Sequence, residues 1–171
     1  MSVSLYGSGQ TVIQAVSTNL TGTVTTAIAT GGNPATFYPI SGFSVNITPL
    51  STTSKILILV QGCGSNATWN YLTAFQLRRS GTIVGASSAS GYNTASVGEQ
   101  RASQDSNSQF NFNWHFLDSP ATTSTITYQV YVTAELSSAT FVLNNAGNQN
   151  ASAGYSALSA SNITVLEIAT S

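Results

Sequence analysis

The sequence predicts an all-β fold, namely an antiparallel β-sandwich of about ten strands arranged as a jelly roll. Only 5% of the 171 residues are charged, so the helix formers Lys, Arg and Glu are almost missing. Ser, Thr and Asn, which favour strands and turns, make up roughly a third of the chain. Apolar and polar residues alternate with a period of two from one strand to the next, and no stretch has sustained helical spacing.

The strand expected at the centre of the sandwich is formed by residues 55–61. Its sequence, KILILVQ, is apolar on both faces, which predicts that it is covered on both sides. Just before it, residues 43–47 alternate between apolar and polar side chains, and Pro49 ends that strand. The shorter candidate strands are residues 11–17, 22–29, 95–102 and 139–143.

The middle of the chain contains a predicted hairpin and the most regular alternating strand. Tyr71, Phe75 and Leu77 share one face of a strand, and a Ser-Gly pair then turns the chain into a short strand at residues 82–84. In residues 110–116, three Phe and one Trp alternate with Asn and His. This strand therefore has one apolar face and one amide-rich face.

The last third of the chain completes the predicted sandwich. Asp118, Ser119 and Pro120 break the chain after the aromatic strand. Residues 126–133 then form another alternating strand, and residues 162–169 form a closing one.

Charge and length limit the classes of partner. Four Lys or Arg against five Asp or Glu give a net charge of -1, so no surface could neutralise several phosphates of a nucleic acid. No apolar run approaches the roughly 20 residues of a membrane helix. We therefore expect no nucleic-acid partner and no insertion into a membrane.

We expect residues 1–10 to form a short N-terminal arm and residues 11–171 to form a single jelly-roll domain. The first ten residues lack basic side chains followed by an apolar segment, so we expect no secretory signal and synthesis in the host cytoplasm. A neutral, hydroxyl-rich surface without an export signal suits a virus particle, which assembles inside the cell and leaves by lysis. The expected location is therefore the virion.

The same shortage of charge predicts an oligomer. Sandwiches usually protect their edge strands with Lys, Pro or inward-pointing charges, and this chain has few of these residues. A monomer with a net charge near zero and alternating aromatic strands would be prone to associate. Because jelly rolls often pack side by side around a threefold axis, we expect a homotrimer.

Few residues could carry chemistry. His115, the single histidine, lies close in sequence to Asp118 and Ser119, but neighbours at one strand end do not converge as a catalytic triad. We therefore predict no catalytic residue and no enzyme activity, with His115 either structural or lining a trimer axis. Glu99 and Asp105 form a local carboxylate pair, which we assign to a solvated loop. No metal site and no cofactor are predicted.

Three further side chains are given structural roles. Cys63, between two glycines after an apolar run, is predicted to be small and buried, the alternative being a reactive or interchain thiol. Arg78 and Arg79 mark the end of a hairpin strand, and Arg78 is expected to form an ion pair across the sheet or between subunits.

Aromatic residues supply the candidate binding site. Aromatic faces pack on the apolar side of sugar rings. Trp69 and Tyr92 lie beside turn-rich segments and are the candidate glycan contacts, whereas Trp114 lies on the apolar face of its strand and is assigned to the core.

Three stretches of the chain together carry a family resemblance. They are residues 12–16 (VIQAV), residues 41–49 (SGFSVNITP) running into 54–58 (SKILI), and residues 116–123 (FLDSPATT) running into 128–130 (YQV). In this order they resemble the distal domain of phage virion proteins known as tail-fibre or structural proteins, common among phages of aquatic bacteria. The resemblance covers nearly the whole chain.

The resemblance implies a trimeric jelly roll on the particle surface, similar in architecture to tumour-necrosis-factor-like heads. As a tail-fibre head it would bind host surface polysaccharide through loops at one end. The alternative is a capsid decoration or cement protein that stabilises the shell. In either case a shaft, baseplate or capsid protein is an expected partner, and the residues expected to anchor the chain to the particle are Met1, Ser2, Val3, Ser4, Leu5 and Tyr6.

Overall fold

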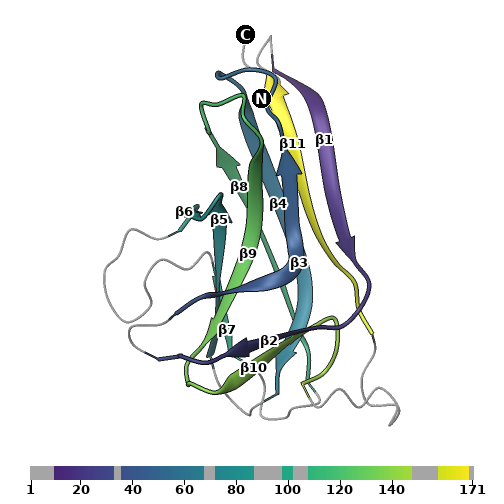
Figure 1. Ribbon diagram of the computed structural model, residues 1–171. Helices are drawn as coiled ribbons and strands as arrows, with labels where there is room; N and C mark the ends of the chain where they lie inside the picture. Colours follow the sequence, from purple (N-terminus) through teal and green to yellow (C-terminus); the bar gives the residue numbers. More distant parts are fainter. Residues whose placement is uncertain are drawn as a thin grey trace, which may run out of the picture.

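The computed structural model describes residues 10–32, 36–67, 72–86, 98–101, 108–147 and 158–169, with residues 98–101 described as backbone only. These residues form eleven strands and no helix (Figure 1). The prediction of an all-β fold is confirmed. The strands are β1 (Thr11–Leu20), β2 (Val24–Ile28), β3 (Tyr38–Ile47), β4 (Lys55–Asn66), β5 (Leu72–Arg79), β6 (Thr82–Val84), β7 (Gly98–Arg101), β8 (Phe110–Asp118), β9 (Ile126–Ala134), β10 (Ala139–Leu143) and β11 (Ser161–Ala169).

The strands make two antiparallel sheets. In the six-stranded sheet, called sheet A, β4 pairs with β8 along one edge and with β11 and then β10 along the other. Strand β1 lies beyond β11, and β2 lies beyond β10. In the five-stranded sheet, called sheet B, the order is β3-β9-β5, and β6 and β7 share the far edge of β5.

The strand order matches a jelly roll. When β2, β6 and β10 are set aside, sheet A reads β1-β11-β4-β8 and sheet B reads β3-β9-β5-β7. Each sheet interleaves strands from the two halves of the chain, as expected for two Greek keys wound into one sandwich. The first residue of β1 pairs with the last residue of β11, so the described ends of the chain lie together (Figure 1).

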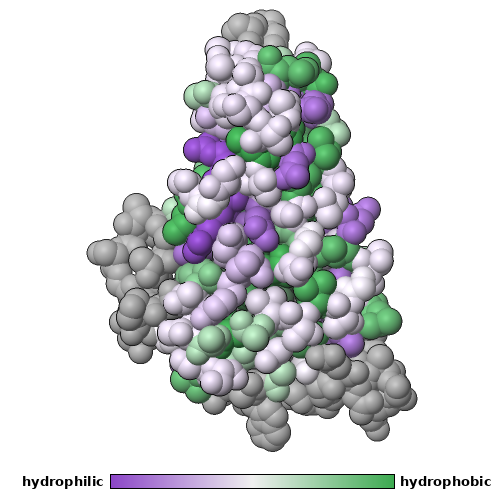
Figure 2. Space-filling model, in the orientation of Figure 1, coloured by the Kyte–Doolittle hydropathy of each residue, from purple (hydrophilic) through white to green (hydrophobic). Residues whose placement is uncertain are grey.

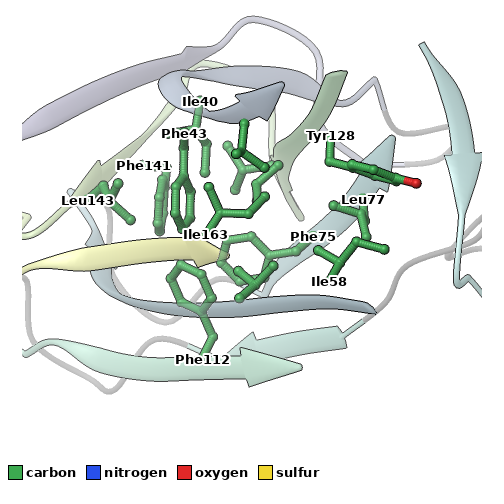
Figure 3. Close-up of a cluster of buried hydrophobic side chains, with 14 of the residues drawn as sticks. Ile40, Phe43, Ile58, Phe75, Leu77, Phe112, Tyr128, Phe141, Leu143 and Ile163 are labelled. Atoms are coloured by element: carbon green, nitrogen blue, oxygen red, sulfur yellow. The ribbon is translucent and has the colours of Figure 1, made fainter. Parts of the chain in front are cut away.

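Aromatic rings from both sheets fill the core. Phe75 of sheet B stacks on Phe112 of sheet A with ring centroids 4.3 Å apart, and it meets the edge of Phe141 at 5.6 Å. Phe43 of β3 also packs against Phe112, with ring centroids 6.4 Å apart. Figure 3 shows these rings enclosed between the two sheets with branched aliphatic side chains around them. Burial of this apolar surface is the main force that holds the sheets face to face.

Two glycines in β4 make room for these rings. A Cβ atom on Gly62 would lie 2.1 Å from the ring of Phe112, and one on Gly64 would lie 2.6 Å from the ring of Phe141. Both distances are far below van der Waals contact, so only glycine fits at either position. The glycines explain why the apolar run of β4 changes composition halfway along the strand.

Asn144 ties the end of β10 to three other segments. Its φ is 64°, a left-handed conformation that Asn adopts more readily than most residues. Its Nδ2 donates to the carbonyl oxygens of Leu20 and Gly22, its Oδ1 accepts from Ser161 Oγ, and its backbone N–H donates to the carbonyl of Cys63. A buried amide thus satisfies backbone groups where several strands end.

Two expectations about β4 are wrong. The strand is central in sheet A, but sheet B covers only one of its faces. On the other face, Leu57 is half-buried and Leu59 is 39% exposed, with no described residue layered over them. Cys63 lies on this same outer face, half-buried, and its thiol donates to Gln109 Oε1 at 3.0 Å. Side-chain alternation explains both the exposure of the leucines and the position of Cys63, because odd-numbered residues of β4 point away from sheet B.

The substitution Gly62→Ala tests the close approach in the core. We expect it to lower the free energy of unfolding by about 3 kcal/mol, because the added methyl group must displace the ring of Phe112. Urea denaturation of the purified protein measures this change. Gly22→Ala is the matched control, since its Cβ meets no atom within 4 Å, and it should leave stability nearly unchanged. Equal effects of the two substitutions would contradict the packing argument.

Candidate functional site

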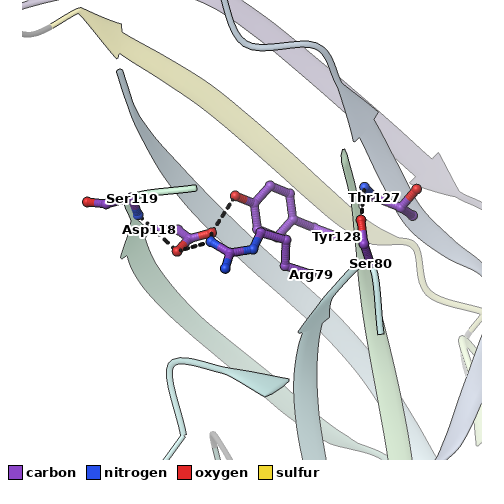
Figure 4. Close-up of polar contacts among 6 residues, drawn as sticks. All are labelled: Arg79, Ser80, Asp118, Ser119, Thr127 and Tyr128. Carbon is purple, nitrogen blue, oxygen red and sulfur yellow. Dashed lines mark hydrogen bonds and ion pairs between the residues drawn. The ribbon is translucent and has the colours of Figure 1, made fainter. Parts of the chain in front are cut away.

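A buried carboxylate links the two sheets at the end of β8. Asp118 accepts hydrogen bonds from Arg79 Nη1 at 2.9 and 2.8 Å, from the Tyr128 hydroxyl at 2.7 Å and from the backbone N–H of Ser119 at 2.9 Å (Figure 4). Arg79 belongs to β5 and Tyr128 to β9, so both partners come from sheet B while Asp118 comes from sheet A. This cluster, Asp118, Arg79, Tyr128 and Ser119, fastens one sheet to the other.

The chemistry of the cluster is structural. Burial, together with the hydrogen bond to Asp118, raises the pKa of the Tyr128 hydroxyl far above its ordinary value of 10, so the hydroxyl stays protonated and donates. His115 does not join the cluster, because it lies on the exposed outer face of β8 and Asp118 lies on the inner face. His115 and Asp118 therefore do not converge, as the triad argument from the sequence predicts.

The outer face of sheet A is apolar over one half. The registers place Ala15, Leu166, Leu57 and Leu117 in one row across the four strands β1, β11, β4 and β8. We call the apolar patch the set of side chains formed by Val12, Ile13, Leu57, Leu59, Leu117, Leu166 and Ile168. Val12 is 52% exposed and Leu117 is 46% exposed. These exposed apolar side chains gather on one part of the face, which makes it a candidate interaction site.

The other half of the same face is lined by amides and hydroxyls. Asn19, Asn162, Gln61 and Asn113 form a row across the same four strands. Asn162 Nδ2 donates to Asn19 Oδ1 at 2.5 Å and to Ser17 Oγ at 2.8 Å, so neighbouring strands are joined through their side chains. The apolar patch is therefore bordered by a polar row, as the centre and rim of protein interfaces are.

The outer face of sheet B has a different composition. Figure 2 looks onto this sheet and shows hydrophilic side chains gathered over the middle of β9 and beside it. Arg78 from β5 lies over the ring of Tyr131 from β9, with Cζ 4.1 Å from the ring centroid. Its Nε and Nη2 both donate to Oε1 of Gln76, at 3.1 and 2.8 Å. The guanidinium is thus held in one orientation by a neighbouring ring and a buried amide.

Among the described residues, Arg79 and not Arg78 forms the ion pair within the chain, while an ion pair of Arg78 with another subunit stays a prediction. Arg79 forms the ion pair, with Asp118, whereas Arg78 bonds to a neutral amide. The alternation of β5 explains this difference, because Arg79 points toward sheet A and Arg78 points to the outer face. Trp114 packs on the core against Phe112, as predicted, with ring centroids 5.6 Å apart.

The structure does not test the candidate binding residues from the sequence. Trp69 and Tyr92, the candidate glycan contacts, and Met1, Ser2, Val3, Ser4, Leu5 and Tyr6, the candidate anchoring residues, lie outside the described residues. So does Asp105, and only the backbone of Glu99 is described. These assignments stay predictions.

Sequence reasoning missed the two outer faces as functional features. The apolar patch had a signal, since Leu57, Leu59 and Leu117 stand at positions opposite the core-facing residues of their strands. The contact between Arg78 and Tyr131 had no signal in the sequence, because the two residues are far apart in the chain and are brought together by strand pairing.

Among the described residues, no group of three His, Cys, Asp or Glu side chains could hold a metal ion. That part of the chain also contains no helix long and apolar enough to cross a membrane.

Comparisons with known proteins find a distant likeness in fold. No family model matches the sequence, and no curated protein matches it. A chain from infectious bursal disease virus, Gx strain, is similar with a TM-score of 0.48 and 9% identity over 91% of this chain and 38% of that one. Another chain, from a particle of the same virus, has a TM-score of 0.48 and 8% identity over 92% and 38%.

A third chain, from the VP2 subviral particle of that virus, has a TM-score of 0.43 and 11% identity over 93% of this chain and 38% of that one. The chain therefore spans well under half the length of these solved chains. The likeness concerns the fold alone, and the function is inferred from the geometry of this chain.

The pKa of Tyr128 predicts how stability changes at alkaline pH. Below pH 10 the hydroxyl is protonated in both states, and its stabilising contribution is fully present. Above that pH the unfolded chain loses this proton and the folded chain keeps it, so unfolding becomes easier by up to about 1.4 kcal/mol per pH unit. Urea denaturation of the wild-type protein and of Tyr128→Phe from about pH 9 to pH 11 should give a shallower decline for the variant. Identical declines would show that Tyr128 titrates normally.

Proposed function

We propose that the chain is a non-enzymatic structural protein of a bacteriophage virion, exposed on the particle as the trimeric head of a tail fibre. The observation that carries the proposal is the apolar patch on sheet A. The patch is exposed to solvent, and the chain has few charged residues that could prevent it from associating with another protein. The family resemblance of the strand-edge sequences supports the same assignment. Host surface polysaccharide is the proposed ligand of the head, with Trp69 and Tyr92 as the proposed contacts and residues 1–6 as the proposed anchor to the particle.

The face supplies most of the area of one standard subunit interface. Four strands about 4.8 Å apart and about 30 Å long give roughly 600 Å² of projected area. Each partner in a standard interface buries roughly 800 Å². Covering the face with another chain would remove the apolar patch from water. This burial would stabilise the complex by roughly 25 cal/mol for each Å² of apolar surface.

A second copy of this chain is the proposed cover. The face carries one formal cation, Lys55, and no carboxylate among its described side chains, so two copies would meet without a strong charge conflict. Its amide row offers both donors and acceptors, so it can bond to the polar surface of a neighbouring copy, which in a threefold ring is a different surface from this face. The resemblance to trimeric phage heads favours three copies.

A capsid decoration protein is the second candidate function. The same open face favours it, because the face could instead cover a neighbouring capsid subunit. The two candidates differ in where the chain sits on the particle and in whether the purified protein associates with itself.

The oligomeric state tests the interface. Light scattering on the purified protein should give about three times the chain mass of 17.7 kDa. Leu59→Glu, at the centre of the face, should shift the protein to monomers, because a charge at a covered position cannot be solvated. Ile83→Glu is the matched control, since Ile83 is 40% exposed and Leu59 is 39% exposed, but Ile83 belongs to sheet B. Circular dichroism checks that both variants fold.

Two outcomes would contradict the interface. One is a wild-type protein that stays monomeric at micromolar concentration. The other is a Leu59→Glu variant that keeps the wild-type mass, which would place the contact on a different surface.

The position on the particle separates the two candidate functions. For a fibre head, gold-labelled antibody should mark the tail tips of intact virions, and the purified protein should compete with phage for adsorption to host cells. For a decoration protein, label should cover the capsid, and particles without the protein should adsorb normally but break at a lower temperature. Absence of the chain from purified virions would overturn both candidates.

A further inference from the structure

Arg78 is a fixed cation on the face opposite the apolar patch. It stands in the middle of sheet B, half-buried, between the Tyr131 ring and the Gln76 amide. In the described part of the chain, the one ion pair joins Arg79 to Asp118, and Arg78 has no carboxylate partner. A partly desolvated guanidinium without a counter-ion attracts anions more strongly than a freely solvated one.

The hydrogen bonds of Arg78 leave one edge of the guanidinium for a ligand. Nε and Nη2 both bond to Oε1 of Gln76, which occupies the side edge of the group. Nη1 makes no hydrogen bond to any described residue, so the end edge formed by Nη1 and Nη2 keeps two donors in the plane of the group. A carboxylate accepts two parallel hydrogen bonds from such an edge.

The neighbouring residues add groups that suit a sugar. Gln129 of β9 lies directly opposite Arg78 in the register, and Ser44 of β3 lies directly opposite Gln129. One row across sheet B therefore presents a cation, an amide and a hydroxyl on the same face, within about 10 Å given the spacing of strands. Amides and hydroxyls bind sugar hydroxyls, and the guanidinium binds an acidic group on the same ring.

We propose that Arg78, Gln129 and Ser44 form a binding site for a carboxylate-bearing sugar of an acidic polysaccharide. This inference rests on the proposed function, because it names the chemical class of the host polysaccharide. It also gives the two outer faces different tasks, with sheet A turned to other subunits and sheet B turned to the ligand. Because Gln76 and Tyr131 hold the guanidinium in advance, binding would cost little side-chain entropy.

Polysaccharide binding by the intact protein tests the site. Biolayer interferometry with immobilised alginate, a polymer of uronic acids, should show binding that weakens as salt is added. Dextran, which is neutral, should not bind. Arg78→Gln should weaken alginate binding at least tenfold, and Arg78→Lys should fall between this variant and the wild type, because an ammonium lacks the bidentate edge.

A charge-matched control separates the site from general electrostatics. Lys55→Gln removes one positive charge from the sheet A face and should leave alginate binding unchanged. Thermal melting of all variants shows whether Arg78 acts only in folding, in which case Arg78→Gln would melt early and still bind when folded.

The results distinguish this inference from the proposed function. Equal alginate binding by wild type and Arg78→Gln, equal binding of alginate and dextran, or binding of dextran sulfate but not alginate would each overturn the carboxylate site. A trimer found in virions would leave the proposed function standing in those cases. Alginate binding that depends on Arg78, in a chain absent from virions, would instead support the site and overturn the proposed function.

Discussion

The ring of Phe112 links the two sheets in the core, because it packs over Gly62 of the neighbouring strand in sheet A and stacks on Phe75 of sheet B. Phe112 fills the space that a side chain at Gly62 would occupy, and from there it reaches Phe75 in the opposite sheet. The ring of Phe141 packs against both members of this pair. Because the sheets are fixed to each other here, the strands of each sheet can present a complete outer face, and both proposed surfaces depend on that rigidity.

Polar contacts hold the sandwich where the aromatic core ends. Asp118 joins the sheets near one end through Arg79 and Tyr128, and Asn144 joins β1, β4 and β11 near the other. At the Asp118 end, Oε1 of the buried Glu167 accepts the backbone N–H of Leu50 and closes the β3–β4 connection. These groups bond to backbone, to hydroxyl groups or to opposite charge, and such partners make burial tolerable in a chain with so few charges.

The two outer faces divide the surface by chemistry. Sheet A exposes leucine, isoleucine and valine beside a row of amides, while sheet B exposes amides, hydroxyls and one ordered arginine. A surface of the first kind gains free energy when another protein covers it, and a surface of the second kind can stay hydrated until a polar ligand arrives. This asymmetry supports the two proposals, which are assembly through sheet A and sugar binding through sheet B.

The all-β class and the approximate positions of the strands could be predicted from the sequence, because period-two alternation and turn residues are local signals, although β3 begins at Tyr38 and β4 continues to Asn66, beyond the predicted bounds. Residues 110–116 were assigned correctly from alternation alone, and the strand continues to Asp118. The sequence could not determine what lies over each strand face: residues 55–61 are apolar on both faces, but only tertiary structure shows that one of those faces is open. The Arg78–Tyr131 contact was equally hidden, since it depends on the register between β5 and β9. Alternation fixes which residues share a face, whereas strand pairing between distant segments decides which faces meet and which remain bare.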